Sequence, residues 1–251
     1  MSSSSSSLAP PATPTPSPAG SPVPTPSPVP SPSPSPTPNS TTVSEIQQHS
    51  GWGVCTGSCA GTGTAVYSMT QGMALPSLSG SSARFQLLAG TQPYSGALWF
   101  NYVGSFDSAT HFVYDLSFYV DNPAAAQALE FGVGQSAGGN RYRFYTQCLL
   151  VGGQVWRVWN PATSAWVASS VPCAVPAANT WTHLVWEFER DSSGNVVFTA
   201  VTVDGARAPV NLTMPHDSDS TSGVDVSFQP DADVVATPYS VWLDNVTLTF
   251  W

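Results

Sequence analysis

The sequence has 251 residues, including 24 prolines, and its 15 acidic against six basic side chains give a net charge of -9 at pH 7. This acidic balance excludes nucleic acid or an anionic membrane surface as the main partner, because both require a basic face. The sequence has no run of about 18 apolar residues, so we expect no membrane insertion.

Residues 1–44 differ in composition from the rest, with no charged residue and 14 of the 24 prolines. Such a segment has too little apolar surface to offset the entropy of ordering, and its Ser-Pro and Thr-Pro repeats favour extended polyproline II. We therefore expect a disordered Pro/Ser/Thr-rich linker over 1–44 and one globular domain over 45–251. The opening MSSSSSS lacks the basic and apolar regions of a signal peptide, so we expect that a signal has been removed or that the sequence belongs to a longer chain.

Beyond the linker, short runs rich in β-branched and aromatic residues alternate with Gly, Pro, Asn and Asp turn signals. Residues 51–64, which contain CTGSC, read as a Gly/Ser/Thr-rich loop, and 122–127 as one helical turn at most. The expected strands are 65–69, 84–88, 96–103, 111–121, 128–135, 140–150, 154–159, 165–168, 181–190, 195–204, 209–214, 224–229 and 239–251. This pattern predicts an all-β fold, a two-sheet antiparallel β-sandwich of the jelly-roll kind.

The hairpin over 128–147 combines an aliphatic and a polar face. A period of two sends Leu129, Phe131 and Val133 to one side and Glu130 to the other. With the turn centred near residues 137 and 138, Glu130 is expected close to Arg143 and Tyr145.

The four cysteines suggest two disulfides in an exported protein. Of the three possible connectivities we favour the local one, Cys55–Cys59 with Cys148–Cys173. The alternative of a zinc site is disfavoured because CxxxC with two distant single cysteines lacks the paired spacing of such sites.

Two segments carry a family resemblance. Residues 128–132, ALEFG, resemble the AVEFD strand of legume lectins and the ExDxxE strand of laminarinases and related endo-glucanases. The closing strand YSVWLDNVTLTFW resembles the last strand of carbohydrate-binding jelly rolls, which ends in D-x-V/I-x-L. Residues 45–251 thus resemble the concanavalin A-like lectin/glucanase class, and more narrowly secreted bacterial proteins of unassigned function with a Pro/Ser/Thr-rich spacer.

The resemblance implies the fold but departs from both families at their functional positions. Glu130 matches the first acid of either motif, whereas Gly132 stands at the second acid and Gln135 at the position of the glucanase acid/base. Glutamine cannot protonate a leaving oxygen, so catalysis of that kind is not expected on this strand, nor is the lectin metal pair.

If strands 111–121, 128–135, 140–150, 154–159 and 181–190 share a sheet, their polar face forms a candidate sugar-binding surface. Aromatic rings stack on pyranose faces, and carboxylates and guanidiniums hydrogen-bond to hydroxyls. The candidate ligand-binding residues are Asp115, Tyr119, Glu130, Arg143, Tyr145, Arg157, Trp159, His183 and Glu187. The alternatives are a solvated face of ion pairs, and a catalytic cleft in which Glu130 and Glu187 act as acid and base.

The tryptophans fall into two groups, those that could stack on a sugar at the surface and those expected in the core. Trp156 and Trp159 alternate on one hairpin with Trp166 nearby, so Trp156 and Trp159 cannot both be core, and an exposed one suits a sugar. Four other tryptophans are expected to lie in the core, because large aromatic side chains are mostly buried: Trp52, Trp99, Trp186 and Trp242.

The acidic loop 216–225 with DAD at 231–233 is the candidate site for a structural calcium, although Thr221 and Ser222 break the EF-hand template. No other metal and no organic cofactor is expected.

Together these features predict a secreted or cell-surface carbohydrate-binding module, which holds polysaccharide in a sheet groove by aromatic stacking and Arg/Glu hydrogen bonds. It would be a monomer or one part of a larger multidomain protein. The alternatives are an endo-acting glycoside hydrolase or polysaccharide lyase in the same groove, and a structural cell-surface protein.

Overall fold

The computed structural model describes residues 39–251, and residues 1–38 of the linker predicted over 1–44 lie outside the described residues. The described chain is 64% β-strand with almost no helix. The strands are β1 (Thr41–Val43), β2 (Gly53–Gly61), β3 (Ala65–Met73), β4 (Ser82–Gly90), β5 (Ser95–Gly104), β6 (His111–Val120), β7 (Ala126–Ala137), β8 (Asn140–Leu149), β9 (Val155–Asn160), β10 (Ala165–Pro172), β11 (Trp181–Arg190), β12 (Val196–Val203), β13 (Ala206–Met214), β14 (Asp217–Ser218), β15 (Gly223–Ala232) and β16 (Tyr239–Phe250). Two short 3-10 turns, η1 (Ile46–Gln48) and η2 (Pro123–Ala125), interrupt them.

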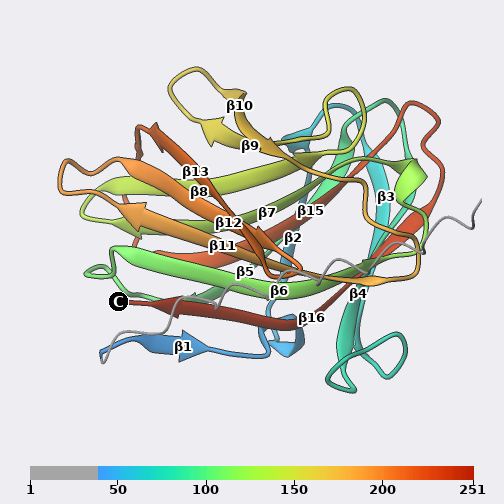
Figure 1. The fold of residues 1–251 in the computed structure, drawn as a ribbon, viewed down its shortest axis with the longest axis horizontal. Coiled ribbons are helices and arrows are strands. Elements are labelled where there is room, and N and C mark those ends of the chain that lie inside the picture. The colour runs from blue at the N-terminus through green and yellow to red at the C-terminus, as the bar shows by residue number, and fades with distance from the viewer. Residues whose placement is uncertain (1–38) are drawn as a thin grey trace, which may run out of the picture.

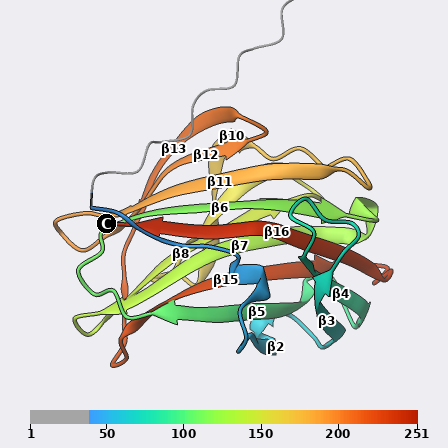
Figure 2. The ribbon, with the colours of Figure 1, turned by 90° about the horizontal axis from the view of Figure 1, so that it is seen from below.

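The strands form two antiparallel sheets of eight, which lie face to face as two layers (Figures 1 and 2). Sheet A has the order β13-β12-β11-β6-β16-β4-β3, with β1 added to β16. Sheet B has the order β10-β9-β8-β7-β15-β5-β2, with β14 added to β8. The predicted two-sheet antiparallel β-sandwich is confirmed.

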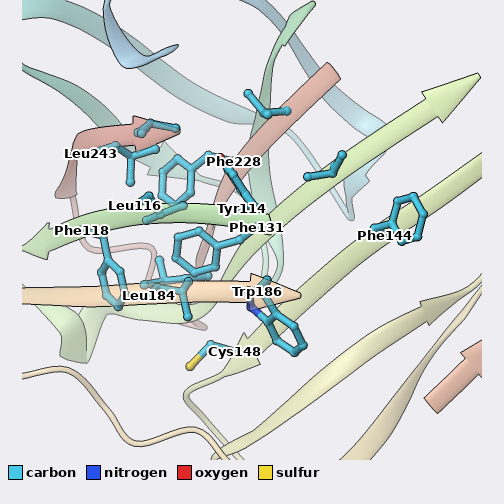
Figure 3. Packing of buried hydrophobic residues seen from close by; sticks show 14 of the residues in the cluster. Tyr114, Leu116, Phe118, Phe131, Phe144, Cys148, Leu184, Trp186, Phe228 and Leu243 are labelled. Carbon is cyan, nitrogen blue, oxygen red and sulfur yellow. The ribbon is translucent and has the colours of Figure 1, made fainter. Parts of the chain in front are cut away.

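The core fills the space between the inner faces of the sheets. The period-two alternation places Phe131 of β7 and Phe228 of β15 inward, with ring centroids 5.4 Å apart, and the pair meets sheet A through Phe118 and Phe85. Figure 3 shows this packing, with Trp186 beside the same cluster. Aromatic pairs of this kind stabilise by about 0.5–1.5 kcal/mol beyond the area they bury, so they help fix the two layers in register.

Three strands fall outside the predicted set. β1 lies in the segment that the sequence assigns to the linker, so regular structure begins by residue 41. β2 occupies the predicted loop around CTGSC, because backbone pairing with β5 does not need the large side chains that signal a strand. β14 lies in the predicted polar loop and pairs with the start of β8.

Both predicted disulfides are confirmed. Cys55 is bonded to Cys59 within β2, and Cys148 of β8 is bonded to Cys173 after β10. The second bridge closes a loop of 25 residues and ties the end of the β9–β10 hairpin to the middle of sheet B. Within residues 39–251, the fold contains no helix of the length and apolarity that crossing a bilayer takes.

The expected sharing of one sheet by the polar-face strands is wrong. β6 and β11 pair with one another in sheet A, whereas β7, β8 and β9 pair in sheet B. Period two shows which side chains share a face of one strand, but it does not show which strands pair. The predicted polar face is therefore split between the two outer surfaces of the sandwich.

Candidate functional site

A groove of about 730 Å³ crosses the outer face of sheet B. One wall comes from the disulfide-bridged strand β2, at Ser58, Cys59 and Gly61. The opposite wall is the β9–β10 hairpin, which extends past the other strands at the top of Figure 1. There Trp159 and Trp166 lie half-buried with ring centroids 5.3 Å apart in an edge-to-face arrangement. The floor lies between these walls on β5, β15, β7, β8 and β9.

A row of four polar residues crosses the floor at one level. Arg157 of β9 is opposite Gln147 of β8, Gln147 is opposite Glu130 of β7, and Glu130 is opposite Gln229 of β15. Hydrogen bonds run along the row: the Arg157 guanidinium donates to Oε1 of Gln147, and Nε2 of Gln147 donates to Oε1 of Glu130 at 2.6 Å. The chain of donors orients Glu130 from the side of the tryptophan wall.

Asp231 completes this row from the other side. Its side chain accepts a hydrogen bond from Nε2 of Gln229 at 2.8 Å, and it lies near enough to Glu130 for each carboxyl to affect the pKa of the other. Asp231 is only 1% exposed, and Gly96 of β5 makes room for it, because a Cβ at Gly96 would collide with its Oδ1. The groove floor therefore contains two neighbouring carboxyl groups.

Burial governs the acidity of both carboxyls. Desolvation raises the pKa of Glu130 from 4.5 to about 7, against the opposing hydrogen bonds from Gln147 and Asp231 and the charge of Arg157. Desolvation, and next the charge of Glu130, raise the pKa of Asp231 well above its usual range. Burial thus disfavours the ionisation of both carboxyls.

The neighbouring row shows why residue 132 is glycine. Gly132 is opposite Tyr145 of β8 and Ser227 of β15, and a Cβ on Gly132 would lie 2.6 Å from the Tyr145 ring and 2.7 Å from Oγ of Ser227. The absent side chain lets the Tyr145 ring lie across β7. The position that carries the second acid in the resembling families here makes room for an aromatic ring.

Replacing Gly132 with Ala is expected to destabilise the protein by about 1–3 kcal/mol, because the ring of Tyr145 must move out of its place on the floor. Urea unfolding measures the change. The double variant Gly132→Ala with Tyr145→Ala relieves the contact and is expected to be more stable than the sum of the single effects. Strict additivity of the two substitutions would contradict this account.

The acidic side chains of residues 217–225 contact polar residues of β7 and β8 in the groove and at its rim. Asp217 pairs with Nε of Arg143, and Asp225 of β15 pairs with Arg141 at 2.6 Å. Asp219 accepts a hydrogen bond from Ser136 at 2.6 Å. Among residues 39–251 no three His, Cys, Asp or Glu side chains converge as a metal cluster. The carboxylates of the loop predicted for calcium supply partners to the polar residues of β7 and β8.

The nine predicted site residues divide between the two outer faces. The groove brings together five of them: Glu130, Arg143, Tyr145, Arg157 and Trp159. The other four lie on the outer face of sheet A: Asp115, Tyr119, His183 and Glu187.

On sheet A these four residues are engaged with one another or with their neighbours. Oδ1 of Asp115 is 2.7 Å from Nε2 of His183, and this hydrogen bond raises the pKa of His183. Glu187 accepts two hydrogen bonds from Arg207, at 2.7 and 2.8 Å.

The pairing of Glu130 with Glu187 as acid and base is wrong. Glu130 faces the groove of sheet B, and Glu187 faces outward from sheet A between inward-facing Trp186 and Phe188. Sheets pack about 10 Å apart, so two outward-facing carboxyls are separated by the whole sandwich. No sugar can contact both.

The register of the central hairpin also differs from the expectation. The turn lies at Gly138 and Gly139, both with positive φ, so Ala137 pairs with Asn140. A turn centred one residue later shifts the pairing by two, and Glu130 is opposite Gln147 rather than Tyr145. Gln135 faces the core, where it donates to the carbonyls of Phe106 and Ala109.

The sequence interpretation missed Asp231, Gln147, Gln229 and Trp166 as groove residues. The alternation on β8 places Gln147 with Arg143 and Tyr145 and could have identified it. Asp231 was assigned to the calcium loop, and nothing in its local pattern shows that β15 is the neighbour of β7.

Trp99 and Trp186 are core as expected, and Trp52 packs partly buried against the core. Of the alternating pair, Trp156 is core and Trp159 lines the groove. Trp242 is buried but lies outside the core, beside Tyr119 on the outer face of sheet A.

No family model and no curated protein sequence matches the chain. Its structure is similar to that of the cellulose-induced protein Cip1, with a TM-score of 0.52 and 8% identity over 82% of this chain and 96% of that chain. A second similar structure is the PL-14 alginate lyase from Aplysia kurodai, with a TM-score of 0.49 and 12% identity over 72% of this chain and 86% of that chain. A third is the carbohydrate recognition domain of Emp47p, with a TM-score of 0.48 and 11% identity over 83% of this chain and 94% of that chain. At such identities a likeness shows a shared fold. The chain has the concanavalin A-like lectin/glucanase fold.

Proposed function

We propose that the protein is a carbohydrate-binding module that holds a polysaccharide in the groove of sheet B. The observation that carries the proposal is the pairing of an aromatic wall with a row of polar side chains in one open groove. Tyr145 and Trp159 offer rings for the apolar face of a pyranose, while Gln147, Glu130 and Arg157 offer donors and acceptors for its hydroxyls.

The groove also suits a chain rather than a compact ligand. It extends between the two edges of sheet B, from the disulfide-bridged β2 to the β9–β10 hairpin, and its volume of about 730 Å³ can hold several sugar rings. The similar protein Cip1 is, by its name, induced by cellulose. That name agrees with a role on plant polysaccharide.

Two disulfides are typical of a protein that works outside the reducing cytosol, where polysaccharide is also found. An extracellular place of action is therefore part of the proposal.

The test is retention on insoluble polysaccharides, namely cellulose, xylan and laminarin, for the wild type and Trp159→Ala. Loss of the ring is expected to weaken retention at least about tenfold, because a central aromatic anchor contributes 1.4 kcal/mol or more. The matched control is Trp181→Ala, which removes a half-buried tryptophan at the start of β11 in sheet A and should leave retention unchanged. Absence of retention on every polysaccharide would rule out the proposed function, and release of reducing ends would support the enzymatic alternative.

A further inference from the structure

We infer that the polysaccharide crosses the strands of sheet B along one row of aromatic side chains, and that Phe100 of β5 is a second ring on which it stacks, beyond the groove floor. This inference rests on the proposed function and adds to that groove a further binding residue, a path for the sugar chain and a dependence on its length.

The row follows from the strand register across the middle of sheet B. Tyr145 of β8 is opposite Gly132 of β7, which is opposite Ser227 of β15. Ser227 in turn is opposite Phe100 of β5. On the side of the tryptophan wall, Trp159 of β9 lies one position past the last pair with β8 and so continues the row beyond Tyr145. One level of the sheet thus holds the rings of Trp159, Tyr145 and Phe100.

Phe100 lies over a glycine, as Tyr145 does. A Cβ on Gly53 of β2 would be 2.5 Å from the Phe100 ring, and one on Gly132 would be 2.6 Å from the Tyr145 ring. Each ring therefore lies low across the neighbouring strand, which leaves the space above it open. Phe100 is 41% exposed, although phenylalanine is among the residues most often buried. An exposed ring in a fixed orientation is what stacking on a pyranose requires.

The surface between these two rings is low and uncharged. Gly132 has no side chain, and Ser227 is small and only 5% exposed. With the Tyr145 ring over β7 and the Phe100 ring over β2, three interstrand spacings, or about 14 Å, separate the rings. A single sugar ring cannot stack on both, whereas a chain that crosses the strands can.

Polar rows border this path on both sides. On one side lies the row that runs from Arg157 through Glu130 to Gln229. At the next level on the other side are Arg143 of β8 and Asp225 of β15. A pyranose has C–H groups on its faces and hydroxyls around its edge, so a sugar on the aromatic row places its hydroxyls over the polar rows. The arrangement favours a chain that crosses the strands over one that lies along them.

Tyr102 offers a matched control on the same strand and the same face. It is 58% exposed, but its ring extends over Gly223 at the start of β15, whereas the row crosses β15 at Ser227. Its hydroxyl is hydrogen-bonded to Oγ of Ser105 at 2.7 Å. The Tyr102 ring is therefore directed away from the proposed path.

The experiment measures, by isothermal titration calorimetry, the affinity for disaccharides and hexasaccharides derived from cellulose, xylan and laminarin. A disaccharide stays on the polar floor beside Trp159 and Tyr145, whereas a hexasaccharide also reaches Phe100. Phe100→Ala is expected to lower the hexasaccharide affinity about tenfold and to leave the disaccharide affinity within about twofold. Trp159→Ala should lower both affinities, and Tyr102→Ala should lower neither.

Two further variants separate the position of the ring from its presence. Phe100→Tyr keeps the ring and should retain the hexasaccharide affinity. Gly53→Ala keeps Phe100 but displaces its ring, so it should lower that affinity as Phe100→Ala does. Urea unfolding of each variant checks that the fold is intact.

An unchanged hexasaccharide affinity in Phe100→Ala, or equal losses in Phe100→Ala and Tyr102→Ala, would overturn the inference while leaving carbohydrate binding in place. Sedimentation velocity tests a second copy as the other occupant of the exposed ring, and a wild-type dimer that Phe100→Ala dissociates would also overturn the inference. Absence of wild-type binding to every saccharide and polysaccharide instead removes the proposed function, and the inference with it.

Discussion

Replacement of Asp244 with Ala is expected to lower the free energy of unfolding by about 3–5 kcal/mol, a large effect for one surface-loop anchor. Asp244 is fully buried on β16, and its carboxylate accepts hydrogen bonds from the hydroxyls of Ser77 and Ser79 at 2.6 Å each. It also accepts hydrogen bonds from the backbone N–H groups of Leu78, at 2.6 Å, and Asn245, at 2.8 Å. Alanine leaves all of these donors without their acceptor.

Chemical denaturation with urea measures this loss. The variant Asp244→Asn keeps the size of the side chain but removes its negative charge, so it shows how much of the loss is due to the charge. Asparagine keeps one acceptor oxygen but turns an amide NH₂ toward other donors, so an intermediate loss is expected. Burial raises the pKa of Asp244, but the hydrogen bonds from Ser77, Ser79 and Leu78 outweigh it and hold the pKa below its usual value. Its contribution is therefore present above the unfolded pKa near 4 and is lost as pH falls further. A variant within about 0.5 kcal/mol of the wild type would show that the loop 77–79 is not held by this carboxylate.

Asp244 also shows what the sequence could indicate about the fold. The motif D-x-V-x-L in the last strand supports the family resemblance without a physical reason, and the structure supplies one: the aspartate joins the last strand to the loop before β4. The alternating runs, such as residues 111–120 and 181–190, predict strands because every second residue enters the core. That periodicity can be recognised within each strand alone, and it was sufficient to predict the fold class.

The site depends on pairings that local patterns do not contain. The residues of the β7–β8–β9 meander were predicted together because short turns join them, and they do line one groove. His183 and Glu187 were wrongly added because β11 alternates in the same way, although it pairs with β6 in the other sheet. Asp231 was missed for the converse reason, since about 100 residues separate β15 from its neighbour β7.

In the absence of any sugar, Asp231→Asn is expected to make the protein more stable than the wild type at about pH 8 and to change its stability little at about pH 5. Burial, and then the mutual charge, raise the pKa of Glu130 and Asp231 in the folded protein. Between the unfolded values near 4 and the folded values, the folded state binds more protons than the unfolded chain. Stability is therefore complete below about pH 4 and decreases as pH rises through neutrality.

The magnitude follows from the same linkage. The shift of the Glu130 pKa from 4.5 to about 7 corresponds to roughly 3 kcal/mol at pH values above both. Asparagine at 231 removes one of the two titrations and the repulsion that opposes the other, so a gain of about 1–3 kcal/mol is expected near pH 8. Urea unfolding at several pH values from about 5 to 8 measures it, with Asp107→Asn on the exposed surface as a control for the substitution itself.

This outcome tests the carboxyl pair independently of any ligand. A wild-type stability that rises between about pH 5 and 8, or a variant with the same slope as the wild type, would mean that Asp231 is ionised beside Glu130 without penalty. Repulsion between the two carboxyls would then be absent. Because Glu130 stays buried in the variant and burial is the largest cause of its raised pKa, the slope is expected to decrease in Asp231→Asn without disappearing.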